Sequence, residues 1–239
     1  MIIIQPSIDP TLISFGFLDI RWYSLSYIFT FIFGSILIKK FNKQSLNLIS
    51  NDQIDKFFIW AVIGVIIGGR IGYVVFYQSN LFLLDPLYIF EIWKGGMSFH
   101  GGLAGMILSI YFFAKKNNFS FFYLSDLVSI VAPIGLFLGR VSNFINTELY
   151  GRITDFPFAF IYPLVDNNPR HPSQLYEALF EGIVLFFILY FYFIKNKKKY
   201  LIGNLSAYFL IFYSIFRFLI EYLREPDLHL GLFFNYFSM

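Results

Sequence analysis

Six long apolar segments dominate the sequence and leave little room for any other structure. They lie at roughly residues 20–38, 57–77, 98–114, 123–141, 174–194 and 201–223. Each is long enough for an α-helix to cross the hydrocarbon core of a bilayer, and none shows the short alternating segments of a membrane β-barrel. With 57% hydrophobic and 14% charged residues, the chain does not fit an ordinary soluble globule. The sequence therefore predicts an all-α, polytopic membrane helix bundle with six spanning helices.

The lysines indicate which ends of these helices face the cytoplasm. All but Lys94 lie in the turns after the first, third and fifth segments, at Lys39, Lys40, Lys43, Lys56, Lys115, Lys116, Lys195, Lys197, Lys198 and Lys199. Short loops rich in lysine and arginine stay on the cytoplasmic side. We therefore expect the amino terminus and the end of the sixth segment to lie outside. The net charge of +3 comes mainly from these lysines and suits anionic lipid headgroups better than nucleic acid.

The arginines lie at or near the opposite ends of the segments. They are Arg21, Arg70, Arg140, Arg152, Arg170, Arg217 and Arg224. Arginine inside an apolar segment is costly and normally faces the bundle interior or a wet cavity. A guanidinium binds phosphate or carboxylate through two parallel hydrogen bonds, which an ammonium does not. We therefore predict a polar pocket that opens outward and takes an anionic ligand.

Five helices are expected to contribute to one polar layer near the outer face, through Tyr23, Arg70, His100, Arg140 and Arg217. A purely structural role remains an alternative for Arg70 and Arg217, the arginines that lie farthest from the helix ends. Arg70 is either a ligand contact or a snorkelling side chain that pairs with Glu91. Arg217 begins a ladder with Glu221 and Arg224, yet positive charge is expected to remain after that pairing.

Two carboxylates, Glu177 and Glu181, lie one helical turn apart near the start of the fifth segment. Structural pairing with Arg170 or Arg152 explains them at least as well as catalysis does. The sequence alone leaves both interpretations open.

His100 lies in the glycine-rich stretch GGMSFHGGLAG, residues 95–105. Gly101, Gly102 and Gly105 allow helices to pack closely or a headgroup to approach the backbone. Histidine is the usual general base, although a lone interfacial histidine is more often a hydrogen-bonding residue. The nearby arginines favour the interpretation of His100 as a general base. The histidines lack the close spacing of metal ligands, so no metal is expected.

The stretch GRVSNFINTELYG, residues 139–151, has the densest group of polar residues. Asn143 and Asn146 are three residues apart and share a face, with Arg140 and Glu148 on either side. A helix cap followed by a polar turn is the alternative. The number of groups able to bind a glycerol phosphate favours recognition of that group.

This stretch resembles the signature GRxGNFxNxExxG of the prolipoprotein diacylglyceryl transferase family. Other landmarks of that family follow in order, namely Trp22-Tyr23, GGRIGYV (68–74), GGMSFHGGLAG (95–105), RHPSQLYEA (170–178) and FRFLIEYLREPD (216–227). The similarity covers nearly the whole chain.

The resemblance implies transfer of diacylglyceryl from phosphatidylglycerol to the lipobox cysteine of a preprolipoprotein, in a bacterial inner membrane with the site facing outward. It implies that Arg140 binds the lipid phosphate, that Asn143, Asn146 and Glu148 order that site, and that Tyr23, His100 and Arg217 are catalytically important. Gly151, Arg70 and Glu221 are further candidates for substrate binding. The chain has no cysteine, which agrees with a nucleophile that belongs to the substrate. No cofactor is expected.

Two features depart from the family pattern. Ser142 replaces a glycine or alanine of the signature and is expected to tighten local helix packing. Relatives continue into a seventh helix after the point where this chain stops, so we expect residues 1–239 to be a single, carboxy-terminally truncated domain. A transporter or scaffold that binds anionic lipid is the main rival function. An intramembrane protease is disfavoured because the apolar segments carry no GxSG, HExxH or aspartate pair.

Overall fold

The computed structural model describes residues 2–16, 19–197, 199 and 201–225, together with the backbone of 232–233 and 237–238. These residues form two compact units. The first consists of Met1–Leu37 and Asp126–Met239, and the second of Ile38–Ser125. Helices α1 and α5 contribute to both units.

The long helices coincide with the six apolar segments. They are α1 (Trp22–Gln44), α2 (Asn51–Tyr77), α4 (Phe99–Lys116), α5 (Phe121–Ile145), the continuous α6 (Ser173–Glu177), π-helical η3 (Ala178–Val184) and α7 (Leu185–Asn196), and α8 (Asn204–Glu221). Within the described residues, 5 helices are long and apolar enough to cross a membrane. Helix α4 is not among them, because it carries His100 in its first turn and Lys115 and Lys116 in its last. The chain is a mostly helical, multi-pass membrane protein.

Local hydrogen bonds fix where several helices begin. Ser50 and Gln53 form a capping box at the start of α2, with the Ser50 side chain accepting from Gln53 N. Helix α8 is capped by a carboxylate from another helix. Asp126 on α5 accepts hydrogen bonds from Gly203 N at 2.7 Å and Ser206 N at 2.8 Å. A carboxylate at this position satisfies free N–H groups and complements the helix dipole, so it fixes α8 against α5.

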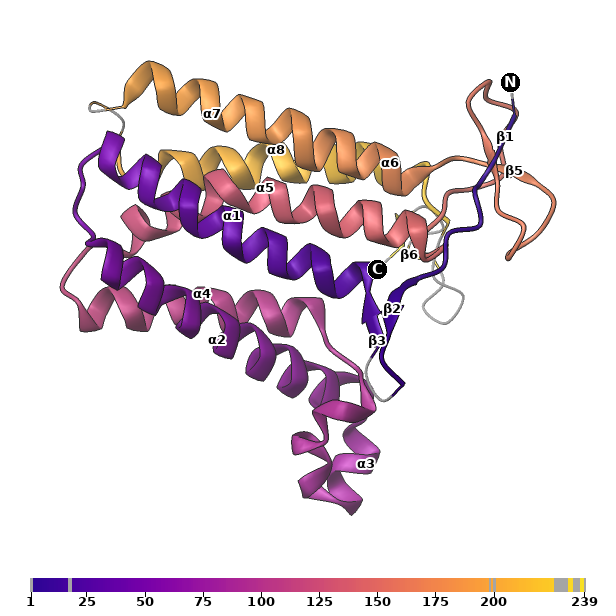
Figure 1. The fold of residues 1–239 in the computed structure, drawn as a ribbon, viewed down its shortest axis with the longest axis horizontal. Helices are drawn as coiled ribbons and strands as arrows, with labels where there is room; N and C mark the ends of the chain where they lie inside the picture. Colours follow the sequence, from indigo (N-terminus) through magenta and orange to yellow (C-terminus); the bar gives the residue numbers. More distant parts are fainter. Residues whose placement is uncertain are drawn as a thin grey trace. The chain divides into compact units, whose positions relative to one another are not determined.

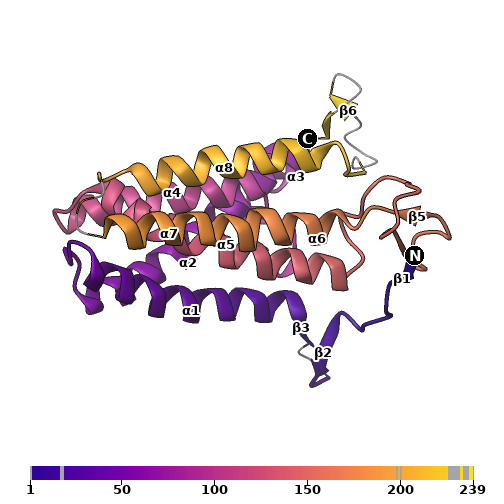
Figure 2. The same ribbon diagram turned by 90° about the horizontal axis from the view of Figure 1, so that it is seen from above.

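Helices α2 and α4 pack closely in the second unit and lie side by side in both views (Figures 1 and 2). A Cβ atom added at Gly105 would lie 2.0 Å from the carbonyl oxygen of Gly64, and one at Gly101 would lie 2.3 Å from that of Gly68. The predicted close packing at these two glycines is confirmed. Gly102 differs, since a Cβ there would meet Val65 at an ordinary 3.6 Å.

The segment between α2 and α4 forms a short arm of α3 (Ser79–Leu84), η1 (Pro86–Phe90) and η2 (Ile92–Lys94). Its apolar side chains are largely exposed, with Leu84 at 84% and Trp93 at 78%. Such a surface suits a position at the membrane interface.

The all-α prediction is wrong in one respect, because small sheets are present. Strand β1 (Ile3–Ile4) pairs in parallel with β4 (Phe160–Ile161), which pairs with β5 (Pro169–Arg170). Strands β2 (Thr11–Ser14) and β3 (Asp19–Arg21) form a hairpin, as do β6 (Leu232–Phe233) and β7 (Phe237–Ser238). Strands this short leave no readable alternation in the sequence. In both views the β4–β5 loop lies at the end of the first unit where α5 ends and α6 begins (Figures 1 and 2).

Candidate active site

Two arginines from different helices meet at one buried carboxylate in the first unit. Arg140 stands near the end of α5, Arg217 near the end of α8, and Glu177 at the end of α6. Arg217 Nη1 donates a hydrogen bond to Oε1 of Glu177. Arg140 Nε lies 2.9 Å from Oε2 of Glu177 in an ion pair. The Glu177 side chain is fully buried, whereas 18% of the Arg140 side chain and 24% of the Arg217 side chain remain exposed.

Two further carboxylates complete this arginine cluster. Glu221 Oε2 lies 2.6 Å from Arg217 Nη2, which confirms the predicted pairing four residues along α8. Glu181 Oε2 lies 3.7 Å from Arg140 Nη2, and neither oxygen of Glu181 accepts a hydrogen bond from the described residues. Three carboxylates therefore lie beside Arg140 and Arg217 and offset their charge. The surplus of positive charge expected around Arg217 stays a prediction.

The structural pairing of Glu177 and Glu181 with Arg170 or Arg152, one of the two interpretations that the sequence left open, is wrong. Arg170 instead pairs with Asp166 at 2.7 Å and with Glu225 at 3.5 Å. The guanidinium of Arg170 holds the pKa of Asp166 well below its usual range, at about 2. These contacts fix the loop between α5 and α6, because Arg170 also donates to the carbonyl of Gly151.

The 139–151 stretch forms a side-chain network at the end of α5. Arg140 Nη1 donates to Asn143 Oδ1 at 3.4 Å, and Asn143 Nδ2 donates to Glu148 Oε2 at 2.8 Å. Asn146 Nδ2 donates to the other oxygen of Glu148 at 3.3 Å. The predicted shared face therefore exists. The polar turn exists as well, since Thr147 and Leu149 adopt positive φ angles of 60° and 56° just after the helix.

Gly151 allows three backbone segments to meet beside this network. Its N–H donates to the carbonyl of His171 at 2.8 Å. A Cβ atom there would lie 2.5 Å from the His171 oxygen and 2.6 Å from that of Leu223. A larger residue would push apart the segment that follows α8 and the segment that follows β5, so this glycine acts through packing.

Helix α1 is tied to the same network one turn after Tyr23. The hydroxyls of Ser26 and Ser142 lie 2.6 Å apart and share a hydrogen bond, and both lie within hydrogen-bond distance of the carbonyl oxygen of Leu138. Ser142, the departure from the family signature, thus contributes a direct contact between α1 and α5. Tyr23 itself accepts a hydrogen bond of 3.4 Å from Tyr27.

Arg70 and His100 belong to the second unit. Arg70 is only 2% exposed and donates to the carbonyls of Tyr88, Ile89, Gly95 and Gly96. Glu91, its expected partner, pairs with Lys94 at 2.8 Å instead. Arg70 therefore anchors the arm that follows α2. His100 is exposed in the first turn of α4 and packs edge-on against Phe99. The layer expected to join these residues to Arg140 stays a prediction.

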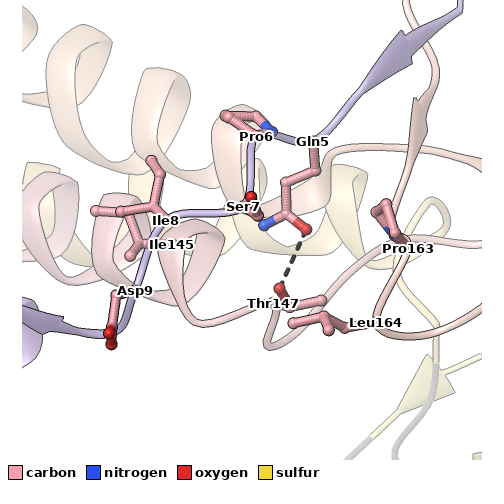
Figure 3. A pocket seen from close by; sticks show the side chains of 9 residues that line it. All are labelled: Gln5, Pro6, Ser7, Ile8, Asp9, Ile145, Thr147, Pro163 and Leu164. Atoms are coloured by element: carbon pink, nitrogen blue, oxygen red, sulfur yellow. Dashed lines mark hydrogen bonds between the residues drawn. The ribbon is translucent and has the colours of Figure 1, made fainter.

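A cavity of about 350 Å³ lies beside the end of α5, between the amino-terminal segment and the loop that follows (Figure 3). Thr147 Oγ1 donates to Gln5 Oε1 at 3.1 Å across it. Its lining residues are Gln5, Pro6, Ser7, Ile8, Asp9, Ile145, Thr147, Pro163 and Leu164. The cavity adjoins the network through Thr147 and contains neither arginine of the cluster.

Comparisons with known proteins identify the family. The family model for prolipoprotein diacylglyceryl transferase matches residues 10–239. This chain belongs to that family. A phosphatidylglycerol–prolipoprotein diacylglyceryl transferase of Vibrio cholerae is 48% identical over 234 residues, which are 98% of this chain and 85% of the relative. Proteins with the same name from Vibrio parahaemolyticus and Vibrio campbellii are each 49% identical over the same shares.

Within this prolipoprotein diacylglyceryl transferase family fold, the structure adds Glu177 and Glu181 to the residues around Arg140. Sequence reasoning left two interpretations open for both glutamates, structural pairing with Arg170 or Arg152 and catalysis. The sequence places both glutamates in the first turns after Pro172, but no sequence pattern predicts which arginine a buried carboxylate pairs with. In the described residues, no group of three or more histidine, aspartate or glutamate side chains is arranged to hold a metal ion.

Proposed function

We propose that this chain transfers the diacylglyceryl group of phosphatidylglycerol to the lipobox cysteine thiol of preprolipoproteins, the first step of lipoprotein maturation. The relatives at 48–49% identity carry the name of this activity. The observation in the structure that supports the proposal is the pair of arginines at Glu177, each partly exposed and held at the ends of packed helices.

The phosphate of phosphatidylglycerol binds at Arg140 and Arg217. Glu177 lies at Nε of Arg140, Asn143 accepts from Nη1, and Glu181 lies 3.7 Å from Nη2, so the hydrogens that remain on Nη1 and Nη2 are the donors for an incoming anion. A fork of this kind fits two phosphate oxygens at once. Asn143, Asn146 and Glu148 hold Arg140 and supply polar partners for the glycerol headgroup. Gly151 keeps this network against α8, and Glu221 holds Arg217.

The chemical step is a displacement at the glycerol carbon that carries the phosphate ester. The cysteine sulfur forms a bond to this carbon, the carbon–oxygen bond breaks, and glycerol phosphate leaves with the electron pair. A thiol reacts as its thiolate, so its proton must be removed. His100 accepts this proton and passes it to solvent or the leaving phosphate. The two arginines stabilise the charge that develops on the leaving group, with Tyr23 as a further catalytically important group.

The proposed setting is the bacterial inner membrane, with six crossings and the site toward the outer face. Helix α4 supplies the sixth crossing, because its polar residues lie at its two ends, where headgroups and water begin. The lysine-rich turns then face the cytoplasm. The substrate thiol reaches the site from outside, as a signal-peptide segment anchored in the same bilayer.

The decisive experiment is a transfer assay with purified protein in phosphatidylglycerol-containing micelles and a lipobox peptide. We expect the peptide to gain the mass of one diacylglyceryl group and glycerol phosphate to be released. Phosphatidylethanolamine micelles serve as the lipid control, and a cysteine-to-serine peptide serves as the nucleophile control. Lipid binding without any transfer would support the rival lipid-binding transporter or scaffold.

A further inference from the structure

We propose that Glu177 is a positioning residue that holds Arg140 and Arg217 at a fixed separation, so that their remaining donors converge on one phosphate. This inference rests on the proposed function. It concerns a residue for which the sequence left structural pairing and catalysis both open, and it distinguishes the orientation of the two arginines from their charge.

The geometry gives this role to one carboxylate. Oε1 of Glu177 accepts from Arg217 on α8, and Oε2 meets Arg140 on α5 at 2.9 Å. Because both oxygens belong to one planar group, this carboxylate couples the position of one guanidinium to that of the other, through a hydrogen bond to Arg217 and an ion pair with Arg140. The Glu177 side chain is fully buried, so water does not compete for either oxygen.

The local helix geometry supports the same interpretation. Glu177 ends α6, and the π-helical segment η3 begins at the next residue. A π-helical turn adds backbone to the helix and is frequent at functional sites. Glu181 follows within η3, and its 3.7 Å approach involves only Arg140. Glu177 is therefore the carboxylate shared between the arginines among the described residues.

The charge of Glu177 has an opposite effect on affinity and on catalysis. A buried carboxylate between two guanidiniums neutralises part of their field, which weakens their attraction for an anion. The same contact keeps their donors oriented, which stabilises charge as it develops on the leaving phosphate. Removal of the charge is therefore expected to separate lipid binding from turnover. If the ion pair only stabilised the fold, its removal would reduce lipid binding and turnover together.

Glu177→Gln tests this separation. Glutamine has one acceptor oxygen and one donor NH2 group in place of two acceptor oxygens. Its oxygen accepts a hydrogen bond from one arginine, while its NH2 group faces the donors of the other arginine unfavourably. We expect phosphatidylglycerol binding at least as tight as in the wild type, with turnover at saturating lipid reduced about tenfold or more. Glu177→Asp keeps the charge but is one methylene shorter. We expect reduced turnover and no tighter binding.

Two further variants and a folding check make the test decisive. Glu181→Gln, which removes a charge near Arg140 alone, is expected to lower turnover less than Glu177→Gln does. Glu91→Gln, at the half-buried partner of Lys94 in the second unit, is the control and is expected to leave binding and turnover unchanged. Folding of each variant is checked by thermal unfolding in detergent. If Glu177→Gln does not fold, Glu177→Asp carries the test.

The proposal is overturned if folded Glu177→Gln or Glu177→Asp turns over at the wild-type rate, or if it loses binding and turnover in the same proportion. Failure of the proposed function has a different signature. In that case the wild-type protein itself would give no lipidated peptide, whether or not it binds phosphatidylglycerol.

Discussion

Arg140 and Glu177 face each other from α5 and α6, with Nε of the arginine 2.9 Å from Oε2 of the carboxylate. The same guanidinium donates to Asn143 through Nη1. One planar group therefore meets two partners in different directions and still has donors for a ligand. A compact ammonium does not reproduce this geometry.

Arg140→Lys is therefore expected to impair phosphatidylglycerol use although it keeps the charge. Loss of two-point hydrogen bonding to a phosphate costs on the order of 1–3 kcal/mol, which corresponds to about 5- to 150-fold in kcat/KM. The variant is measured by transfer rate and lipid binding on protein that unfolds at the wild-type temperature. Wild-type values for both would exclude Arg140 from the phosphate site.

His100→Gln is expected to keep lipid binding and lose turnover at neutral pH. Higher pH should partly rescue the variant, because the peptide thiol, with a reference pKa of about 8.5, then deprotonates in solution. The measurement is the ratio of variant to wild-type turnover between about pH 6.5 and pH 9. A constant ratio across this range would argue against a simple base role. An unchanged rate would remove His100 from the mechanism.

Gly105→Ala is expected to destabilise the second unit by roughly 1–3 kcal/mol, because the new methyl group overlaps the backbone of α2. The added Cβ would lie 2.0 Å from Gly64 O. Gly102→Ala is the matched control on the same helix. Its Cβ meets Val65 at 3.6 Å, and alanine favours the helix, so stability should stay equal or rise. Thermal unfolding in detergent compares the two, and equal melting temperatures would contradict the packing described for α2 and α4.

Asp166→Asn is expected to loosen the loop between α5 and α6 at neutral pH. Hydrogen bonds from Arg170 lower the pKa of Asp166 from 3.8 to about 2. A carboxyl with a lowered pKa contributes stability that is present above its ordinary value and is lost as pH falls toward about 2. At pH 7 the wild type has the full contribution, which the variant lacks.

Limited proteolysis of residues 151–172 at pH 7 measures this loosening. Asp155→Asn in the same loop is the control, since Asp155 makes no ion pair within the described part of the chain. Equal cleavage rates in both variants and the wild type would show that the Asp166 pair does not order the loop.

The absence of cysteine makes the topology directly testable. Asn167→Cys places one thiol in the loop after α5, and Ser120→Cys places one in the turn before it; both positions are exposed. In intact spheroplasts, a maleimide that does not cross the membrane is expected to label Asn167→Cys and not Ser120→Cys. Disruption of the membrane should expose both. The reverse pattern would invert the proposed orientation.

The helices could be predicted from the sequence because the bilayer imposes a length and an apolar composition on each crossing. The contact of Arg140 with Asn143 was also predictable, since residues three apart on a helix are neighbours. The pairing of Arg217 with Glu221 follows from the same local rule, and both contacts depend on helical geometry alone. Glu148 joins Asn143 through the turn after α5, where Thr147 has a positive φ angle.

Only the tertiary structure decided which distant groups meet. Glu177 lies closer in sequence to Arg170 than to Arg140 or Arg217, yet it pairs with the latter two because α5, α6 and α8 bring their ends together. Arg70 was expected near Glu91, but its donors satisfy backbone carbonyls that the turn of the arm leaves without partners. The hydrophobic pattern of the sequence predicts which helix carries a residue and how deep in the membrane it lies. The rotation and packing of the helices determine which residue it pairs with.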